Sequence, residues 1–148
     1  MQTTQSFKRY FPEIVSFLFI LLFVYAALSK LLDYQKFRLQ LGQSPLITSI
    51  SGLVAWVIPI LEISISVILA VPKYRLVGLY ASFCLMVMFA AYIIAITRFS
   101  SYTPCSCGGV LEKLSWNQHL VFNIVFVLLA LSAVIVQVKK DNPYPISG

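Results

Sequence analysis

The chain has 148 residues, of which 59% are hydrophobic and only 11% are charged, and its mean hydropathy is +0.88. Soluble domains carry about 45–50% apolar and about 25% charged residues, so this composition excludes a water-soluble domain and also a disordered chain. The net charge is +6, from 11 Lys and Arg against 5 Asp and Glu. Because these cations flank apolar runs and form no patch, we expect them to anchor the protein at a membrane surface and not to bind nucleic acid.

Four apolar runs are long enough to cross the hydrocarbon core of a bilayer, which takes about 20 helical residues. They lie at about 12–32, 47–71, 76–97 and 119–138. None alternates like a barrel strand, and lipid offers no partner to an unpaired backbone, so each run is predicted to be a helix. The sequence therefore predicts an all-α integral membrane protein, a four-helix transmembrane bundle in which residues 1–148 form a single domain that contacts the lipid bilayer.

The connections between these runs carry turn and cap signals. Pro72 ends the second run and leaves a short turn before the third, and Ser115 followed by Gln118 is the capping-box pattern that opens a helix. The segment 33–44 mixes apolar and charged residues, so we expect it to extend the first helix out of the membrane until Gly42 stops it.

The first apolar run also has features of a secretory signal peptide. Lys8 and Arg9 precede it, and Val24-Tyr25-Ala26 resembles a cleavage site. Because the run continues apolar beyond Ala26, we expect it to remain in the protein as a transmembrane helix.

The distribution of Lys and Arg predicts the orientation in the membrane. The side with both termini and the second loop carries six of these cations: Lys8, Arg9, Lys73, Arg75, Lys139 and Lys140. The side with the first and third loops carries five: Lys30, Lys36, Arg38, Arg98 and Lys113. The larger count favours a multi-pass protein with both termini in the cytoplasm and the loop 99–117 outside.

That outside loop contains a Cys-x-Cys motif, Cys105-Ser106-Cys107, followed by Gly108-Gly109. A disulfide across one intervening residue departs from relaxed geometry, so it is expected to be readily reduced and to exchange with another thiol. The pattern points to a dithiol/disulfide pair that passes electrons to or from a partner protein. The alternatives are a purely structural bridge and a soft-metal site formed by the two cysteines and His119. A structural zinc site needs four ligands, and these residues supply only three, so we assign no metal.

Glu62 is the one acidic residue well inside a predicted span. Burying an ionised carboxylate at this depth costs several kcal/mol, so we expect Glu62 to be protonated or to face the interior with partners. Cys84 is predicted to lie at a similar depth, with Tyr25 and Ser132 within another turn. Glu62 is therefore a candidate proton relay or polar binding site, and an interhelical hydrogen bond that fixes packing is the alternative.

The outer end of the fourth span carries further polar candidates. His119 and Asn123 share one helix face, with Trp116 one turn earlier. His119 could exchange a proton as a thiol reacts or a quinone is reduced, or it could be an interfacial residue beside a tryptophan. Lys30 and Arg98, at the outer ends of the first and third spans, could reach the headgroups, tune a thiol or border a quinone site.

Several of these elements together resemble a known family. Three parts of the sequence are similar to the methylamine-utilisation MauE family of DoxX-like four-helix membrane proteins. They are the exit of the first helix, Ala27-Leu28-Ser29-Lys30-Leu31-Leu32-Asp33 with Phe37 and Ser44-Pro45-Leu46; the intramembrane Pro59-x-x-Glu62; and Cys105-Ser106-Cys107-Gly108-Gly109 in the third loop. In this family an aromatic residue often follows the second cysteine, where this chain has Gly108.

The resemblance implies a redox-associated inner-membrane protein that supports the maturation of a disulfide-rich periplasmic protein beside a thioredoxin-like partner. It also implies that quinone could take part, since some DoxX-like relatives donate electrons to quinone. The leading hypothesis is a thiol/disulfide redox protein that uses Cys105 and Cys107, which would make it an oxidoreductase. A non-enzymatic assembly subunit with a structural disulfide and a small proton-coupled transporter that uses Glu62 are the alternatives. The oligomeric state is left open.

Overall fold

A computed structural model describes residues 2–44, 47–99 and 115–142 of the chain. Within these ranges the structure is helical. The elements are α1 Gln2–Leu32, α2 Tyr34–Gln43, the 3-10 turn η1 Thr48–Ile50, α3 Ser51–Ala70, the 3-10 turn η2 Pro72–Tyr74, α4 Arg75–Phe99 and α5 Trp116–Asp141. Four helices in the described part are long and apolar enough to cross a membrane, so the chain is a multi-pass membrane protein of the predicted all-α class.

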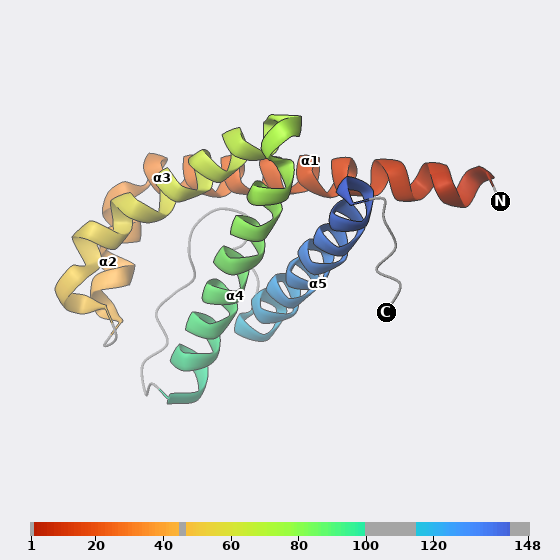
Figure 1. Cartoon of the computed structure of the whole chain (residues 1–148). Coiled ribbons are helices and arrows are strands. Elements are labelled where there is room, and N and C mark those ends of the chain that lie inside the picture. The colour runs from red at the N-terminus through yellow and green to blue at the C-terminus, as the bar shows by residue number, and fades with distance from the viewer. Residues whose placement is uncertain (1, 45–46, 100–114, 143–148) are drawn as a thin grey trace.

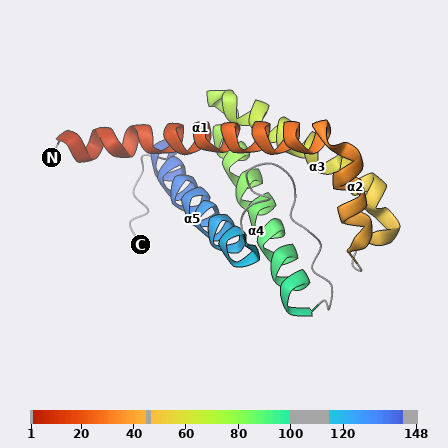
Figure 2. The same ribbon diagram turned by 180° about the vertical axis from the view of Figure 1, so that it is seen from behind.

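The four long helices form two antiparallel pairs that cross each other. Figures 1 and 2 show α1 beside α3 and α4 beside α5, with the second pair at a steep angle to the first. The ends of α1, α4 and α5 where Lys30, Arg98 and His119 lie are on one side of this arrangement. The start of α1, the turn η2 and the end of α5 lie on the other side (Figure 1).

The core lies between the two pairs and is built on one face of α1. Val15, Phe19, Phe23 and Ala27 follow one another at the four-residue spacing that keeps side chains on the same helix face, and all four are buried. Phe19 meets the edge of the Phe126 ring from α5, with 5.3 Å between ring centroids. Large apolar side chains on the opposite faces are exposed, as a lipid environment requires.

The bounds of two elements differ from the sequence prediction. α1 begins at Gln2 and not at Pro12 (Figure 1), because the residues before the apolar run include the good helix formers Gln2, Gln5, Lys8 and Arg9, which continue the helix toward the N-terminus. The segment after α1 is not an extension of that helix: the chain turns at Asp33, and α2 begins at Tyr34. This turn lets Phe37 and Leu41 pack against Ala55 of α3.

Gly42 does not end α2: the helix continues to Gln43, and Ser44 is its C-cap residue.

The capping box at the start of α5 is confirmed. The Ser115 hydroxyl accepts a hydrogen bond from the Gln118 amide at 3.4 Å, and the Ser115 amide donates to Gln118 Oε1 at 3.1 Å.

Gly78 lets α4 lie close against Leu69 of α3. A Cβ atom at this position would lie 2.7 Å from Cδ2, 2.9 Å from Cγ and 3.2 Å from the backbone nitrogen of Leu69, whose side chain is buried. We therefore expect Gly78→Ala to lower the free energy of unfolding by about 1–3 kcal/mol, the usual cost of overpacking. Denaturation of the protein in detergent micelles measures this. Gly52→Ala is the matched control, because its Cβ would meet no atom closer than 3.7 Å, and an equal loss in both variants would contradict the packing argument.

Candidate functional site

The site begins with Lys30 in the last turn of α1. Lys30 lies three residues after Ala27 and so continues the buried face of this helix. Its side chain is only 10% exposed, and its ammonium group donates a hydrogen bond to Glu62 Oε1 at 2.9 Å. The same nitrogen donates to the Ala26 carbonyl at 3.4 Å and lies 5.8 Å from the centre of the Phe37 ring. A cation is thus held inside the protein and does not extend to the headgroups.

Glu62 is fully buried on α3, one turn after Pro59. A carboxylate at this depth needs a partner, and Lys30 supplies one positive charge to one of its two oxygens. The second oxygen, Oε2, is buried and accepts no hydrogen bond within the described part of the chain. Glu62 therefore combines an ion pair at one oxygen with a second oxygen that can still bind a donor.

His119 and Asn123 come from the first two turns of α5. The Asn123 amide donates to the His119 backbone carbonyl at 2.9 Å, which fixes the side chain of Asn123 along the helix. The rings of Trp116 and His119 are stacked with centroids 6.5 Å apart and planes 26° apart. The His119 Nδ1 atom is buried and has no hydrogen-bond partner among the described residues.

A cavity of about 80 Å³ connects these groups, and Lys30, Glu62, His119 and Asn123 all line it. Its other walls are largely apolar and aromatic, with side chains of α1, α4 and α5: Leu22, Phe23, Met86, Phe89, Ile93 and Phe122. The two tyrosines Tyr25 and Tyr92 also border it. A cavity of this size with four polar side chains in its wall suits water or the polar edge of a larger molecule.

This arrangement can bind a polar group and exchange protons with it. Glu62 Oε2 and His119 Nδ1 belong to side chains that line the same small space, and each is a group that can hold or release a proton. The apolar walls lower the local dielectric constant, which strengthens any hydrogen bond made inside the cavity. The ammonium nitrogen of Lys30 lies 2.9 Å from Glu62 Oε1, at the edge of this space.

The structure brings together four of the predicted site residues, namely Glu62, His119, Asn123 and Lys30. Trp116 lies next to this group, on His119. Arg98 is exposed near the end of α4 and does not line the cavity. Cys105 and Cys107 lie outside the described residues, in the segment 100–114 that connects α4 to α5.

Cys84 and Ser132 were predicted to lie near Glu62, and this prediction is wrong because neither lines the cavity. Cys84 is exposed on α4, and Ser132 is exposed on α5 with its hydroxyl bonded to the carbonyl of Leu128 at 2.8 Å. Helix depth placed them at the level of Glu62, but depth says nothing about which way a helix faces. Tyr25, the third residue predicted to lie near Glu62, does line the same cavity.

Sequence reasoning missed the pairing of Lys30 with Glu62 and the contribution of α4. The signal for Lys30 was its place on the buried face that passes through Phe23 and Ala27. On α4, Met86, Phe89 and Ile93 follow the i, i+3, i+7 pattern of one helix face, but α4 is apolar on all sides, so this pattern does not stand out.

Comparison with known proteins gives one family. The sequence model of the family described as methylamine utilisation protein MauE matches residues 8–136, which is most of the chain and includes most of all four long helices. Neither the curated proteins nor the solved structures contain a significant match.

Proposed function

Because this chain belongs to the MauE family of methylamine utilisation proteins, we propose that it exchanges thiol and disulfide equivalents through Cys105 and Cys107. In this proposal the protein supports the maturation of a periplasmic protein and works with a thioredoxin-like partner. The two cysteines face the outside of a bacterial-type inner membrane, where a disulfide persists, and both termini lie in the cytoplasm.

One observation supports this function more than any other: two unpartnered, proton-exchanging atoms belong to side chains that line one cavity near the start of α5. These atoms are Glu62 Oε2 and His119 Nδ1, which have no partner among the described residues. α5 follows directly on the segment that carries Cys105 and Cys107. Thiol oxidation releases protons as well as electrons, so a proton-handling site attached to this segment is what the chemistry needs.

Turnover of the cysteine pair requires a second redox partner, and we propose a membrane quinone. Oxidation of two thiols to one disulfide releases two electrons and two protons, and reduction of a quinone to a quinol takes up the same number of each. The four polar side chains that line the cavity could bind a carbonyl oxygen of such a ring. Glu62 and His119 would supply or accept the protons there, while Lys30 stabilises the charge of Glu62.

Trapping a mixed disulfide tests the thiol exchange. In Cys105→Ser, we expect Cys107 to form a mixed disulfide with the partner and to remain covalently attached, because thiol exchange in either direction passes through this adduct and the second thiol that would resolve it is gone. Non-reducing electrophoresis of membranes from cells blocked with a thiol reagent detects the adduct, and addition of a reductant should remove it. Cys84→Ser is the control, since this exposed cysteine lies on α4, away from the cavity.

The redox state of the pair separates this function from the alternatives. A cycling pair changes its oxidised fraction when respiratory quinone is depleted in intact cells. If Cys105 and Cys107 stay fully oxidised with and without quinone, and Cys105→Ser forms no adduct, thiol exchange is wrong and the disulfide is structural. A protein with a static disulfide would then be an assembly subunit, or a transporter that depends on Glu62.

A further inference from the structure

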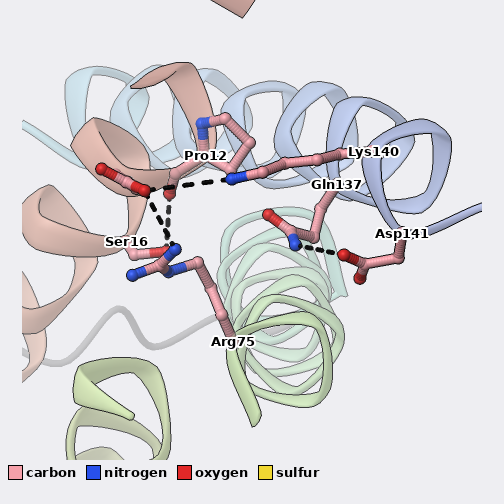
Figure 3. Close-up of polar contacts among 7 residues, drawn as sticks. Pro12, Ser16, Arg75, Gln137, Lys140 and Asp141 are labelled. Atoms are coloured by element: carbon pink, nitrogen blue, oxygen red, sulfur yellow. Dashed lines mark hydrogen bonds and ion pairs between the residues drawn. The ribbon is translucent and has the colours of Figure 1, made fainter. Parts of the chain in front are cut away.

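A second polar cluster lies at the opposite end of the protein from Lys30 and Glu62. It consists of Glu13 from α1, Arg75 from α4, and Gln137, Lys140 and Asp141 from α5, and we call it the Arg75 cluster (Figure 3). Arg75 Nη1 lies 3.4 Å from Glu13 Oε1, and Lys140 Nζ lies 3.9 Å from the same oxygen. Two cations therefore share one carboxylate oxygen, at distances that make each contact weak.

The cluster contains an unpartnered donor and an unpartnered acceptor, both buried. The Arg75 side chain is 14% exposed, and its Nε atom has no hydrogen-bond partner among the described residues. Gln137 is 5% exposed, and its Oε1 atom likewise has none there. Because Gln137 Nε2 donates to Asp141 Oδ1 at 3.0 Å, the orientation of the amide is fixed and its oxygen points away from Asp141 (Figure 3).

From the lengths of α4 and α5 we place the cluster at the depth of the lipid headgroups. Arg75 is the first residue of α4, and Lys140 and Asp141 are the last two residues of α5. Helices of 25 and 26 residues are about 37 and 39 Å long, which exceeds the hydrocarbon thickness of about 30 Å. Their ends therefore extend into the headgroup region of the bilayer.

We infer that the Arg75 cluster binds a lipid with a phosphoethanolamine headgroup. The phosphate lies against Arg75 and Lys140, where the guanidinium can donate two parallel hydrogen bonds and the start of α4 adds its positive dipole. The ammonium group, two carbons away, donates to Gln137 Oε1 and lies near the Asp141 carboxylate. The headgroup thus supplies the acceptor that Arg75 lacks and the donor that Gln137 lacks.

Other common headgroups satisfy only part of this cluster. A phosphocholine headgroup has the same phosphate, but its quaternary ammonium has no N–H to donate to Gln137 Oε1. A phosphoglycerol headgroup can donate a hydroxyl but carries no cation to balance Asp141. The inference therefore predicts a preference among lipids that all carry a phosphate, beyond simple attraction to the positive charges.

Lipid binding by the purified, delipidated full-length protein tests the inference. Native mass spectrometry measures the binding of dioleoyl phosphatidylethanolamine, phosphatidylcholine and phosphatidylglycerol. We expect the first to bind about tenfold more tightly than the second, the factor that one charge-assisted hydrogen bond gives in an equilibrium constant. Gln137→Leu should abolish this preference without weakening binding of phosphatidylcholine, and Arg75→Gln should weaken all three lipids about tenfold. Lys73→Gln, which removes an exposed cation in the neighbouring turn η2, is the control and should change none.

Equal affinities for the three lipids in the wild-type protein would overturn the inference and leave water as the partner of Gln137. A Gln137→Leu variant that keeps the preference would overturn it as well. The wild-type comparison needs no variant, so the test holds even if one of the substituted proteins fails to fold.

Discussion

Lys30→Met is expected to lower the free energy of unfolding by about 3–5 kcal/mol, because it leaves the carboxyl group of Glu62 buried without its cation. Glu62 is fully buried, so bulk water does not reach its carboxyl group to replace the lost cation. The methionine side chain is close to the lysine stem in length and keeps most of its apolar contacts, which restricts the change to the ammonium group. Chemical or thermal denaturation in detergent micelles measures the effect.

A double-variant cycle separates the ion pair from packing. If the loss arises from the unpaired carboxylate, the double variant K30M/E62Q should recover most of it, since a neutral amide costs much less to bury. Arg98→Met is the control for removing a cation from the same end of the protein. Arg98 is exposed, so a change within about 0.5 kcal/mol is expected. Additive losses in the double variant would mean that Lys30 and Glu62 do not stabilise each other.

The transmembrane helices could be predicted from sequence because lipid imposes a simple rule. A run of about 20 apolar residues must be a helix there, and the four predicted runs coincide with α1, α3, α4 and α5. The ends of α1 and the separate helix α2 could not be predicted in the same way. Gln2–Tyr10 extend beyond the lipid, and the turn at Asp33 depends on Phe37 and Leu41 reaching Ala55, which is a tertiary contact.

The pairing of Lys30 with Glu62 shows why the site was only half predicted. Composition identified Glu62 as the exceptional charge inside a span, but it placed Lys30 at the outer end of α1 as an anchor. Side chains of a helix lean toward its N-terminus, so a lysine in the last turn of α1 is directed back toward the middle of the membrane. Its hydrogen bond to the Ala26 carbonyl, one turn earlier, agrees with this direction. The direction of the Lys30 side chain could have been predicted from sequence. The rotation of α1 relative to α3, which places Lys30 beside Glu62, could not.

Glu62→Gln is expected to slow electron transfer between the cysteine pair and membrane quinone about hundredfold, if Glu62 handles a proton in that step. Positioned acids and bases contribute about 10²–10⁴-fold, and an amide cannot take up or release a proton at neutral pH. The amide would still accept a hydrogen bond from Lys30, but the buried ammonium group loses its counter-charge, so the experiment needs a separate readout of folding. The rate of reoxidation of Cys105 and Cys107 after a reductive pulse in membranes, followed by thiol trapping, measures the effect.

The same substitution must leave the first half of the exchange intact. Mixed-disulfide formation by Cys107 in a Cys105→Ser background needs no quinone, so the yield of adduct should be the same with the native Glu62 and with the Glu62→Gln substitution. Asp33→Asn removes an acidic group from the exposed turn between α1 and α2, outside the cavity, and is the matched control for the change from acid to amide. Normal reoxidation in Glu62→Gln would assign Glu62 to packing or to transport. A loss of adduct as well as of reoxidation would instead show that the substitution disturbs the fold on which both steps depend.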